Sequence, residues 1–448
     1  MTRVLSKDAS KHAGKEIIFK GFIRLRRDHG KLIFLDVRDL FGVIQVVVNA
    51  KVSEAAYNLS KKLRPEDVVE IIGKVNKRPD NAVNKDLITG NIELEATDVK
   101  IISKAETLPF DMGGENLNLE LPTLLDNRSL ALRHPQVSAI FKIQETIADT
   151  FRNVLKEKNF TEIFVPTIVP LATEGGAEVF EVKYYDKKAF LAQSPQLYKQ
   201  IMVSVFEKVF TIAHAYRAEP SVTTRHLSEY VSLDAEIGFI NSWEELMDLS
   251  EEIVKKIIAS VKEKNKEELK LFKVKLFDIK NPFPRITLKK AQDIIFERTK
   301  IDHRGEPDLN PGDEKEICNW AKEEYGSPFV FITHYPVEKR PFYTMPDPKD
   351  EKHTLSFDLL GIQEEWVTGG QRINDYDSLL ENMKKWKIDP KSLEIYLQAF
   401  RYGMPKEGGF AMGIERITKD LLGLKNIREA SLFPRDMERV DEKLSDIK

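Results

Sequence analysis

Short runs of β-branched, aliphatic and aromatic residues, separated by turn residues, constrain the fold more than any other feature of the chain. Five of these runs fall between Glu16 and Ile102: EIIFKGFIRLRR, KLIFLDVRD, GVIQVVVN, VVEIIGKVNKR and NIELEATDVKII. Strands so short and so closely spaced are typical of a small closed β-barrel. Residues 51–63, between the third and fourth runs, have a helical pattern. We therefore expect a barrel domain over residues 1–104.

The expected barrel is also the basic part of the chain. Residues 1–104 contain 20 Lys and Arg against 14 Asp and Glu, whereas the whole chain contains 69 against 72. A basic first domain would attract a polyanion, although the same imbalance is common in proteins that bind nothing acidic. Charge alone therefore leaves nucleic-acid binding open.

The composition, 31% charged and 42% hydrophobic over 448 residues, is that of an ordinary globular protein with two or three domains. The apolar runs are far shorter than the roughly 18 to 20 residues that cross a bilayer, and the N-terminus has no signal-peptide core. We therefore expect a cytoplasmic protein without a membrane partner. The one cysteine, Cys318, excludes intrachain disulfides and cysteine-caged metal sites, so any metal would have oxygen or histidine ligands.

Proline and glycine interrupt residues 105–135, which lack a sustained period and are typical of a linker. Beyond them, helical and extended patterns alternate, which predicts an α+β domain over residues 136–448. Helical periodicity is clearest in residues 136–157, 242–263 and 415–422. Extended runs stand at residues 161–170, 209–219, 227–239, 328–336, 355–361 and 408–413.

The familiar nucleotide-binding loops are absent from the sequence, which has no GxxxxGK[ST] and no GxGxxG after a strand. In VFTIAHAYRAE, strand alternation instead puts small side chains, then Arg217 and Glu219, on one face. The following loop and strand add further polar side chains: Arg225, His226, Ser232, Asp234 and Glu236. This set suits an anionic ligand and its metal, but a solvated strand pair fits it equally well.

Two later segments have similar chemistry. In EEWVTGGQR, Glu365 and Thr368 could supply oxygen ligands to magnesium, and Arg372 could bind a carboxylate or phosphate. Strict alternation would put Glu365 and Thr368 on opposite faces, so we expect the chain to bend near Gly369 and Gly370 if both touch one ion. GGFAMGIER runs from a strand into a helix whose N-terminus favours anions. A plain sheet edge would explain either segment alone.

Taken in order, TEIFVPTIVP, AYRAE with RHLSEY, and GGFAMGIER resemble the three signature motifs of class II aminoacyl-tRNA synthetases. The segments ATEGGAEVF, LAQSPQLYKQ, RPFYTMPD, TGGQRI and LKNIREASLFPRD narrow the resemblance to aspartyl-tRNA synthetases, and it covers essentially the whole chain. The resemblance implies an OB-fold anticodon-binding barrel in residues 1–104 and a catalytic domain built on a mixed, mainly antiparallel sheet flanked by helices. It also implies a homodimer that forms through the first motif, around Pro166.

The same resemblance implies sites for ATP and Mg²⁺. Arg217, Glu219 and Arg416 would be catalytic, with Arg217 on the α-phosphate and Arg416 on the far phosphates. Glu365 and Thr368 would coordinate Mg²⁺, with threonine in place of the usual serine. The implied ATP-binding residues are Arg217, Glu219, Arg225, His226, Leu227, Glu365, Gly413, Ile414, Glu415 and Arg416.

The resemblance also implies six residues that bind the amino acid: Glu174, Gln196, Lys199, Arg217, Thr368 and Arg372. Lys199 and Arg372 would hold the side-chain carboxylate, and Gln196 and Glu174 the α-amino group. Asparagine would leave two cations facing a neutral amide, a mismatch worth several kcal/mol, so L-aspartate is favoured. The implied reaction forms aspartyl-adenylate and pyrophosphate, and then transfers the aspartyl group to the 3′ end of tRNA.

On the barrel, the resemblance assigns the tRNA anticodon to Arg27, His29, Phe34 and Gln45. Phe34 would stack on a base, as OB-folds commonly arrange, although a core phenylalanine would fit the pattern too. The loop that holds His29 resembles the kind that accepts tRNA(Asn) beside tRNA(Asp), although a loop histidine is more often simply solvated.

Three alternatives stay open. An asparagine–tRNA ligase is opposed by Lys199. An aspartate–ammonia ligase on the same core would not need the basic barrel with Phe34. A catalytically silent tRNA-binding paralogue would be expected to have lost Arg217, Glu365 or Arg416, and all three are present.

Overall fold

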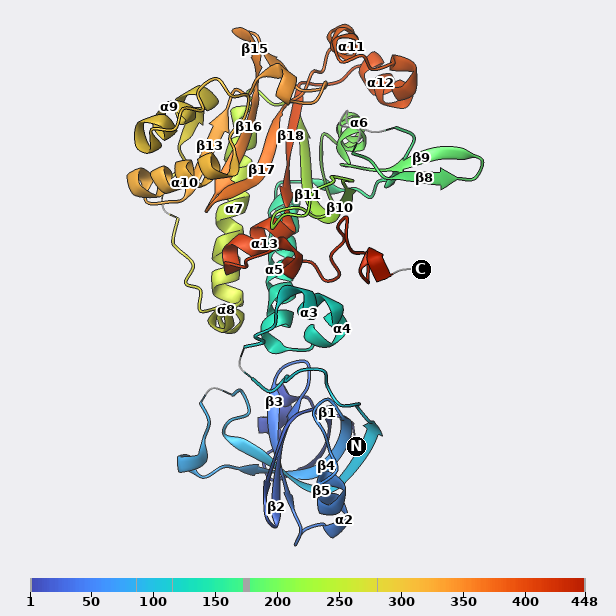
Figure 1. Cartoon of the computed structure of the whole chain (residues 1–448), viewed down its shortest axis with the longest axis vertical. Helices are drawn as coiled ribbons and strands as arrows, with labels where there is room; N and C mark the ends of the chain where they lie inside the picture. Colours follow the sequence, from blue (N-terminus) through green and yellow to red (C-terminus); the bar gives the residue numbers. More distant parts are fainter. Residues whose placement is uncertain (1, 86, 115, 172–177, 280, 447–448) are drawn as a thin grey trace. The chain divides into compact units, whose positions relative to one another are not determined.

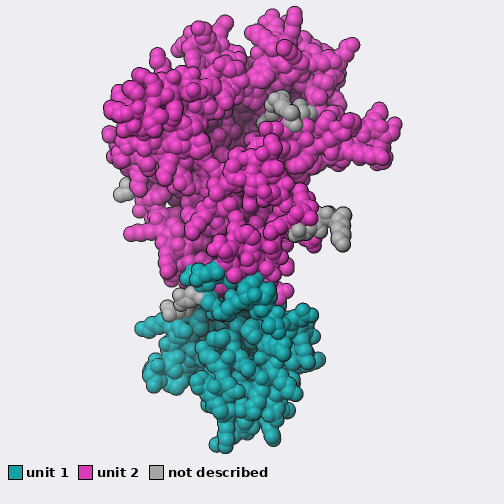
Figure 2. Space-filling model, in the orientation of Figure 1, with its two compact units in different colours: residues 1–118 teal, residues 119–448 magenta. Residues whose placement is uncertain are grey.

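The computed structural model describes residues 2–85, 87–114, 116–171, 178–279 and 281–446, in two compact units (Figures 1 and 2). One unit comprises residues 1–118 and the other residues 119–448. This division falls inside the segment 105–135 that we expected as a linker. The later part of that segment is helical, because α3 (Leu121–Asp126) and α4 (Arg128–Ala131) begin the second unit.

The first unit is a closed barrel with the strand order β1-β2-β3-β5-β4. Its strands are β1 (Glu16–His29), β2 (Leu32–Arg38), β3 (Val43–Asn49), β4 (Val68–Lys77) and β5 (Ile92–Ser103). Alternate apolar residues of these strands point inward and fill the interior. The helix expected over residues 51–63 is the shorter α2 (Glu54–Ser60), which begins where the Ser53 hydroxyl accepts the Ala56 N–H. The expected OB-fold barrel is confirmed.

A mixed sheet forms the centre of the second unit, with the order β12-β13-β16-β17-β18-β11-β10-β6. Its strands are β6 (Thr161–Glu162), β10 (Lys208–Tyr216), β11 (Glu229–Gly238), β12 (Arg285–Thr287), β13 (Phe329–Thr333), β16 (Ser356–Gly361), β17 (Glu364–Gln371) and β18 (Glu407–Gly413). Parallel pairing occurs at the two edges, and the strands between them pair antiparallel. This is the mixed, mainly antiparallel sheet that the sequence predicted.

Helices flank this sheet (Figure 1). On one face, α5 (Pro135–Glu157) and α7 (Glu244–Lys264) bury their apolar stripes, and Phe151 packs edge-on against Phe210 of β10. Near β13 and β16, α9 (Leu288–Thr299) and α10 (Pro311–Tyr325) form a separate apolar core. The remaining α-helices are α1 (Ser6–Ala9), α6 (Gln196–Phe206), α8 (Lys266–Phe272), α11 (Tyr376–Lys385), α12 (Glu394–Arg401) and α13 (Ile414–Leu422).

Smaller elements complete the chain. A sheet of β7 (Ile168–Val169), β9 (Lys187–Leu191) and β8 (Glu181–Tyr184) stands apart, as does the pair β14 (Pro346–Asp347) and β15 (Asp350–Thr354). Residues 161–170, which we expected as one extended run, are split into β6 and β7, because Pro166 between them cannot donate to a ladder. Within the described ranges, no helix is both long enough and apolar enough to cross a membrane.

Candidate active site

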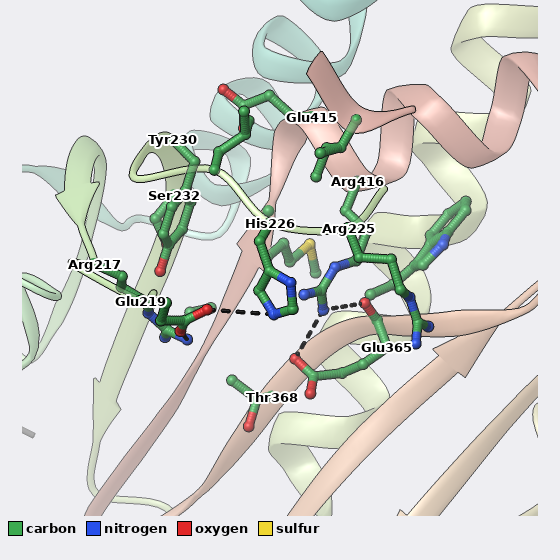
Figure 3. A pocket seen from close by; sticks show the side chains of 16 residues that line it. Arg217, Glu219, Arg225, His226, Tyr230, Ser232, Glu365, Thr368, Glu415 and Arg416 are labelled. Atoms are coloured by element: carbon green, nitrogen blue, oxygen red, sulfur yellow. Dashed lines mark hydrogen bonds and ion pairs between the residues drawn. The ribbon is translucent and has the colours of Figure 1, made fainter. Parts of the chain in front are cut away.

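Three neighbouring strands, β11, β17 and β18, and Arg217 directly after the end of β10 line two adjoining cavities in the second unit. The first cavity is lined by nine of the ten residues that we expected to bind ATP (Figure 3). The tenth, Ile414, is buried in the main apolar core. Because successive helix positions turn by about 100°, Ile414 at the start of α13 points inward while Arg416, two positions later, faces the cavity.

The second cavity contains the residues that we expected to bind the amino acid. Gln196, Lys199, Arg217, Thr368 and Arg372 all line it, whereas Glu174 lies outside the described residues. The two cavities share a wall made of Arg217, Tyr230, Ser232, Glu365, Thr368 and Ala411. Two ligands, one in each cavity, would therefore meet at Arg217.

A β-bulge brings the two expected metal ligands to this shared wall. Leu359 pairs with Val367, but Leu360 pairs with Glu365, so Trp366 is an extra residue in β17. The bulge moves Glu365 onto the face that carries Thr368. We expected the bend at Gly369 and Gly370, and that was wrong. The bend lies earlier, where the buried Trp366 indole donates to Asp420 at 2.8 Å.

The two glycines of β17 serve close packing instead. A Cβ on Gly369 would lie 2.6 Å from the Phe357 ring and 2.8 Å from the Gly409 carbonyl oxygen. A Cβ on Gly370 would lie 2.8 Å from the Leu355 carbonyl oxygen. Both positions therefore require glycine because the adjacent strands approach too closely for any side chain.

Cations and acids alternate around the first cavity. Glu219 lies 3.7 Å from the Arg217 guanidinium and 3.3 Å from the His226 imidazole, so it orients both. Arg416 donates to the backbone carbonyl of Glu365 at 2.7 Å and to its carboxylate at 3.3 Å (Figure 3). Arg217 and Arg416 thus stand on different sides of the cavity, an arrangement that suits a polyphosphate.

A pair of carboxylates adjoins the shared wall. Asp358 of β16 pairs in register with Thr368, and burial, together with Asp358, raises the pKa of Glu365. Among the contacts of the described residues, the buried Oδ1 of Asp358 has no hydrogen-bond partner. Two close carboxylates with an orphaned oxygen and a neighbouring hydroxyl fit a hard divalent cation, although the described residues hold no cluster of three acidic, histidine or cysteine ligands.

Two of these side chains were missed from the sequence. Asp358 interrupts the apolar run LSFDLLG, and an acid at a buried strand position was a usable signal. Arg340, in RPFYTMPD, donates to the Thr368 hydroxyl at 3.0 Å and to Asp358 at 2.7 Å. Its partners, Thr368 and Asp358, lie on strands that only the fold brings next to Arg340. No local sequence pattern could therefore identify Arg340 as a site residue.

Glu415 anchors the start of α13 to β11. Both of its carboxylate oxygens accept the Val231 N–H, at 3.1 and 3.2 Å. Burial raises the pKa of Glu415 to about 8, because water is excluded around the carboxyl and the backbone hydrogen bonds offset this only in part. The residue that we expected at the ATP site is therefore mainly a neutral acid at neutral pH.

Charges are paired at the closed end of the second cavity. Lys199 is completely buried, and its ammonium lies 2.9 Å from Asp234 and 3.1 Å from Glu236. Arg372 donates to Glu236 at 2.7 Å. Although burial raises the pKa of Glu236, Arg372 and Lys199 together hold it below the ordinary value. The acids hold both cations in place in a dry environment.

On the barrel, the four expected anticodon residues lie on the outside. Ile33 and Leu35 point into the core, so Phe34 between them faces outward and is half-buried. The interpretation of Phe34 as a core residue was therefore wrong. Phe34 pairs in register with Arg27 and meets His29 edge-on at 5.5 Å. Gln45 is on the neighbouring strand β3, and like Phe34 it alternates with buried residues.

Comparison with known proteins identifies the family of both units. Residues 120–437 match the family described as tRNA synthetases class II (D, K and N), and residues 17–102 match the OB-fold nucleic acid binding domain. The chain is 39% identical to the aspartate–tRNA(Asp/Asn) ligase of Deinococcus radiodurans, over 98% of this chain and 99% of that protein. It is 42% identical to the aspartate–tRNA(Asp) ligase of Pyrococcus horikoshii, over 95% and 96%.

Among solved structures, the asparaginyl-tRNA synthetase of Pyrococcus horikoshii complexed with asparaginyl-adenylate superposes with a TM-score of 0.88 at 32% identity, over 98% of this chain and 99% of that chain. Proteins of this family use ATP to charge tRNA. The likeness extends over both units, and the site residues expected from the motifs line two joined cavities. The chain therefore belongs to the class II aminoacyl-tRNA synthetases, in the aspartate–tRNA ligase family.

Proposed function

We propose that this ligase activates L-aspartate with ATP and transfers the aspartyl group to the 3′ end of tRNA(Asp) and also of tRNA(Asn). The observation that carries the proposal is the closed end of the second cavity, where Lys199 and Arg372 stand together. Ammonium and guanidinium groups only donate hydrogen bonds, and a carboxylate only accepts them. An asparagine amide has one accepting oxygen where a carboxylate has two, so it would satisfy fewer of these donors and would leave their positive charges uncompensated.

Asparagine is the second candidate, favoured by the likeness to an asparaginyl-tRNA synthetase. The pairing of Lys199 and Arg372 with Asp234 and Glu236 also supports it, since the four charges cancel without a substrate. We prefer aspartate because the Arg372 guanidinium keeps donor hydrogens beyond its bonds to Glu236 and Gln196, and because curated relatives at 39–42% identity are aspartate ligases.

The activation step depends on positioning. The α-carboxylate of aspartate attacks the α-phosphorus of ATP, the bond from phosphorus to the bridging oxygen breaks, and pyrophosphate leaves. Arg217, which lines both cavities, would hold the attacked phosphate, and Arg416 would hold the leaving phosphates. Mg²⁺, when bound, would neutralise the phosphate oxygens, held by Glu365 and Thr368 with Asp358 beside them. No residue needs to form a covalent bond to substrate.

The outer face of the barrel is the proposed anticodon platform. Phe34 offers a partly exposed ring, Arg27 a cation and Gln45 an amide, which together suit an unstacked base. The use of both tRNAs rests on the loop that holds His29. One aligned relative is named for tRNA(Asp) alone and another for tRNA(Asp/Asn). Overall sequence identity therefore does not distinguish an enzyme that charges one tRNA from an enzyme that charges both.

We also propose a homodimer through the segment around Pro166. Phe164 in this segment is 88% exposed, an unusual state for a phenylalanine. Ile168 and Ile395 are further exposed apolar side chains, and an apolar cavity nearby is lined by Leu171, Leu197, Tyr198 and Leu393. A second copy would cover this surface.

One experiment tests the substrate assignment: charging of purified tRNA(Asp) and tRNA(Asn) with labelled aspartate, and in parallel with labelled asparagine. Aspartate on both tRNAs is the expected result. Aspartate on tRNA(Asp) alone would remove the proposed role of the His29 loop, and asparagine on tRNA(Asn) would replace the proposed amino acid.

A further inference from the structure

Segment 264–330 lies between the second and third motifs and has no part in the function proposed so far. It forms α8, β12, α9 and α10. One of its charged side chains reaches the ATP cavity wall: Glu314, in the first turn of α10, pairs with Arg225. Arg225 itself lines that cavity.

Arg225 is held between two acids from different elements. Its Nη2 donates to Glu314, and its Nε donates to Glu364 of β17 at 2.7 Å. Glu364 is 1% exposed and also pairs with Lys419 of α13. The guanidinium therefore joins loop 217–228, the central sheet and α10 in one partly buried network, and points away from Glu219 and Arg217 in Figure 3.

Glu314 stands on a rigid support. The Asn310 side chain caps α10 by accepting the Gly312 and Asp313 N–H groups, at 2.8 and 3.1 Å. Asp313 is bound by His303 at 2.9 Å. Farther along the helix, Ile317 and Cys318 are completely buried in the core with β13 and β16. An acid in the first turn is also favoured by the helix dipole.

Loop 217–228 needs such an anchor because its middle makes few other contacts with the described residues. The Ile427 N–H donates to the Thr224 carbonyl at 2.9 Å, and the Thr223 hydroxyl contacts the His226 imidazole at 2.5 Å. Arg225 lies between these contacts, and a long side chain left unpaired would have many rotamers. Two carboxylates that fix its guanidinium also fix the backbone that carries His226 toward Glu219.

We propose that Glu314 is a positioning residue for ATP: it acts through Arg225 to hold loop 217–228 in the geometry that binds the nucleotide. This inference rests on the proposed function of the first cavity as the ATP site. It gives α10 a role in amino-acid activation, at a distance from the reacting atoms.

The test is aspartate-dependent exchange of pyrophosphate into ATP by the full chain, with ATP and aspartate varied separately. Glu314→Gln keeps the volume and removes the charge, so the KM for ATP should rise about tenfold, as for a lost charged hydrogen bond, while the KM for aspartate stays within about twofold. Glu314→Asp keeps the charge, so it should raise the KM for ATP by a smaller factor than Glu314→Gln does. Glu323→Gln is the matched control, because Glu323 is an exposed acid of the same helix paired with Arg298.

A double variant separates positioning from a general effect on folding. If Glu314 acts only through Arg225, the pair Arg225→Ala and Glu314→Gln should bind ATP no worse than Arg225→Ala alone. Independent, additive losses, or an unchanged KM for ATP in Glu314→Gln, would overturn the inference. Absence of aspartate-dependent exchange in the unmodified chain would instead overturn the proposed function, so the two failures are distinguishable.

Discussion

Glu415 provides the sharpest test of the electrostatics of the second unit. The side chain is 5% exposed, and its carboxyl accepts hydrogen bonds from the backbone N–H groups of Val231 and of Glu415 itself. Burial raises its pKa from the ordinary 4.5 to about 8, and the Glu229 carboxylate adds to that increase. We predict that Glu415→Gln makes the second unit less sensitive to rising pH.

The stability of the wild type falls with rising pH because the folded protein binds the Glu415 proton more tightly than the unfolded chain does. Between pH 4.5 and 8 the folded protein keeps the Glu415 proton that the unfolded chain loses, so the group's contribution to stability is complete below pH 4.5 and is lost as pH rises through 8. Each pH unit in that interval lowers the free energy of unfolding of the wild type by about 1.4 kcal/mol. Glutamine cannot ionise, so the free energy of unfolding of the variant minus that of the wild type should grow by about 3–4 kcal/mol from pH 5 to pH 8.

Urea denaturation followed by tryptophan fluorescence measures this difference. The four tryptophans, Trp243, Trp320, Trp366 and Trp386, all lie in residues 119–448, so the signal reports the second unit alone. Glu324→Gln, at an exposed position of the same unit, is the control and should give a difference that is constant with pH. A Glu415→Gln difference equal at pH 5 and pH 8 would refute the assignment of a neutral, buried carboxyl.

Three further predictions concern the substrates and the assembly. Lys199→Met should abolish aspartate-dependent pyrophosphate exchange and destabilise the second unit by about 3–5 kcal/mol, because Asp234 and Glu236 lose their buried counter-charge; normal exchange would contradict the proposed amino-acid site. Phe34→Ala should weaken tRNA binding by about 1–3 kcal/mol in a filter-binding assay and leave the exchange reaction unchanged; equal tRNA affinity would count against the anticodon platform. Phe164→Glu should give monomers in light scattering, and a persistent dimer would place the interface elsewhere.

The barrel and the long helices could be predicted because their signals are local. The geometry of a strand puts Ile33 and Phe34 of β2 on opposite faces, and three- to four-residue spacing marks α5. The pattern did not determine which face of β2 lies inside the barrel, because a period of two residues is the same for both faces. The closed barrel settles this, with Ile33 in the core and Phe34 outside.

The bulge in β17 shows why the site could be predicted only in part. The sequence indicated that Glu365 and Thr368 needed an irregular strand to face one ion, and the two glycines were the local signal for it. The irregularity occurs at Trp366 instead, because the pairing with β16 and the bond to Asp420 of α13 select that residue. A bulge is a property of two strands together, so one strand's sequence does not locate it.

The sequence by itself determined which side chains were available for chemistry and, through its motifs, which residues to look for. Only the tertiary structure decided their partners and their charge states. Arg372 meets Glu236 across 136 residues, and Arg225 meets Glu364 across 139. The pKa of a buried group depends on the charges and the water that folding brings to it or removes from it, and those neighbours come from strands and helices far apart in the chain.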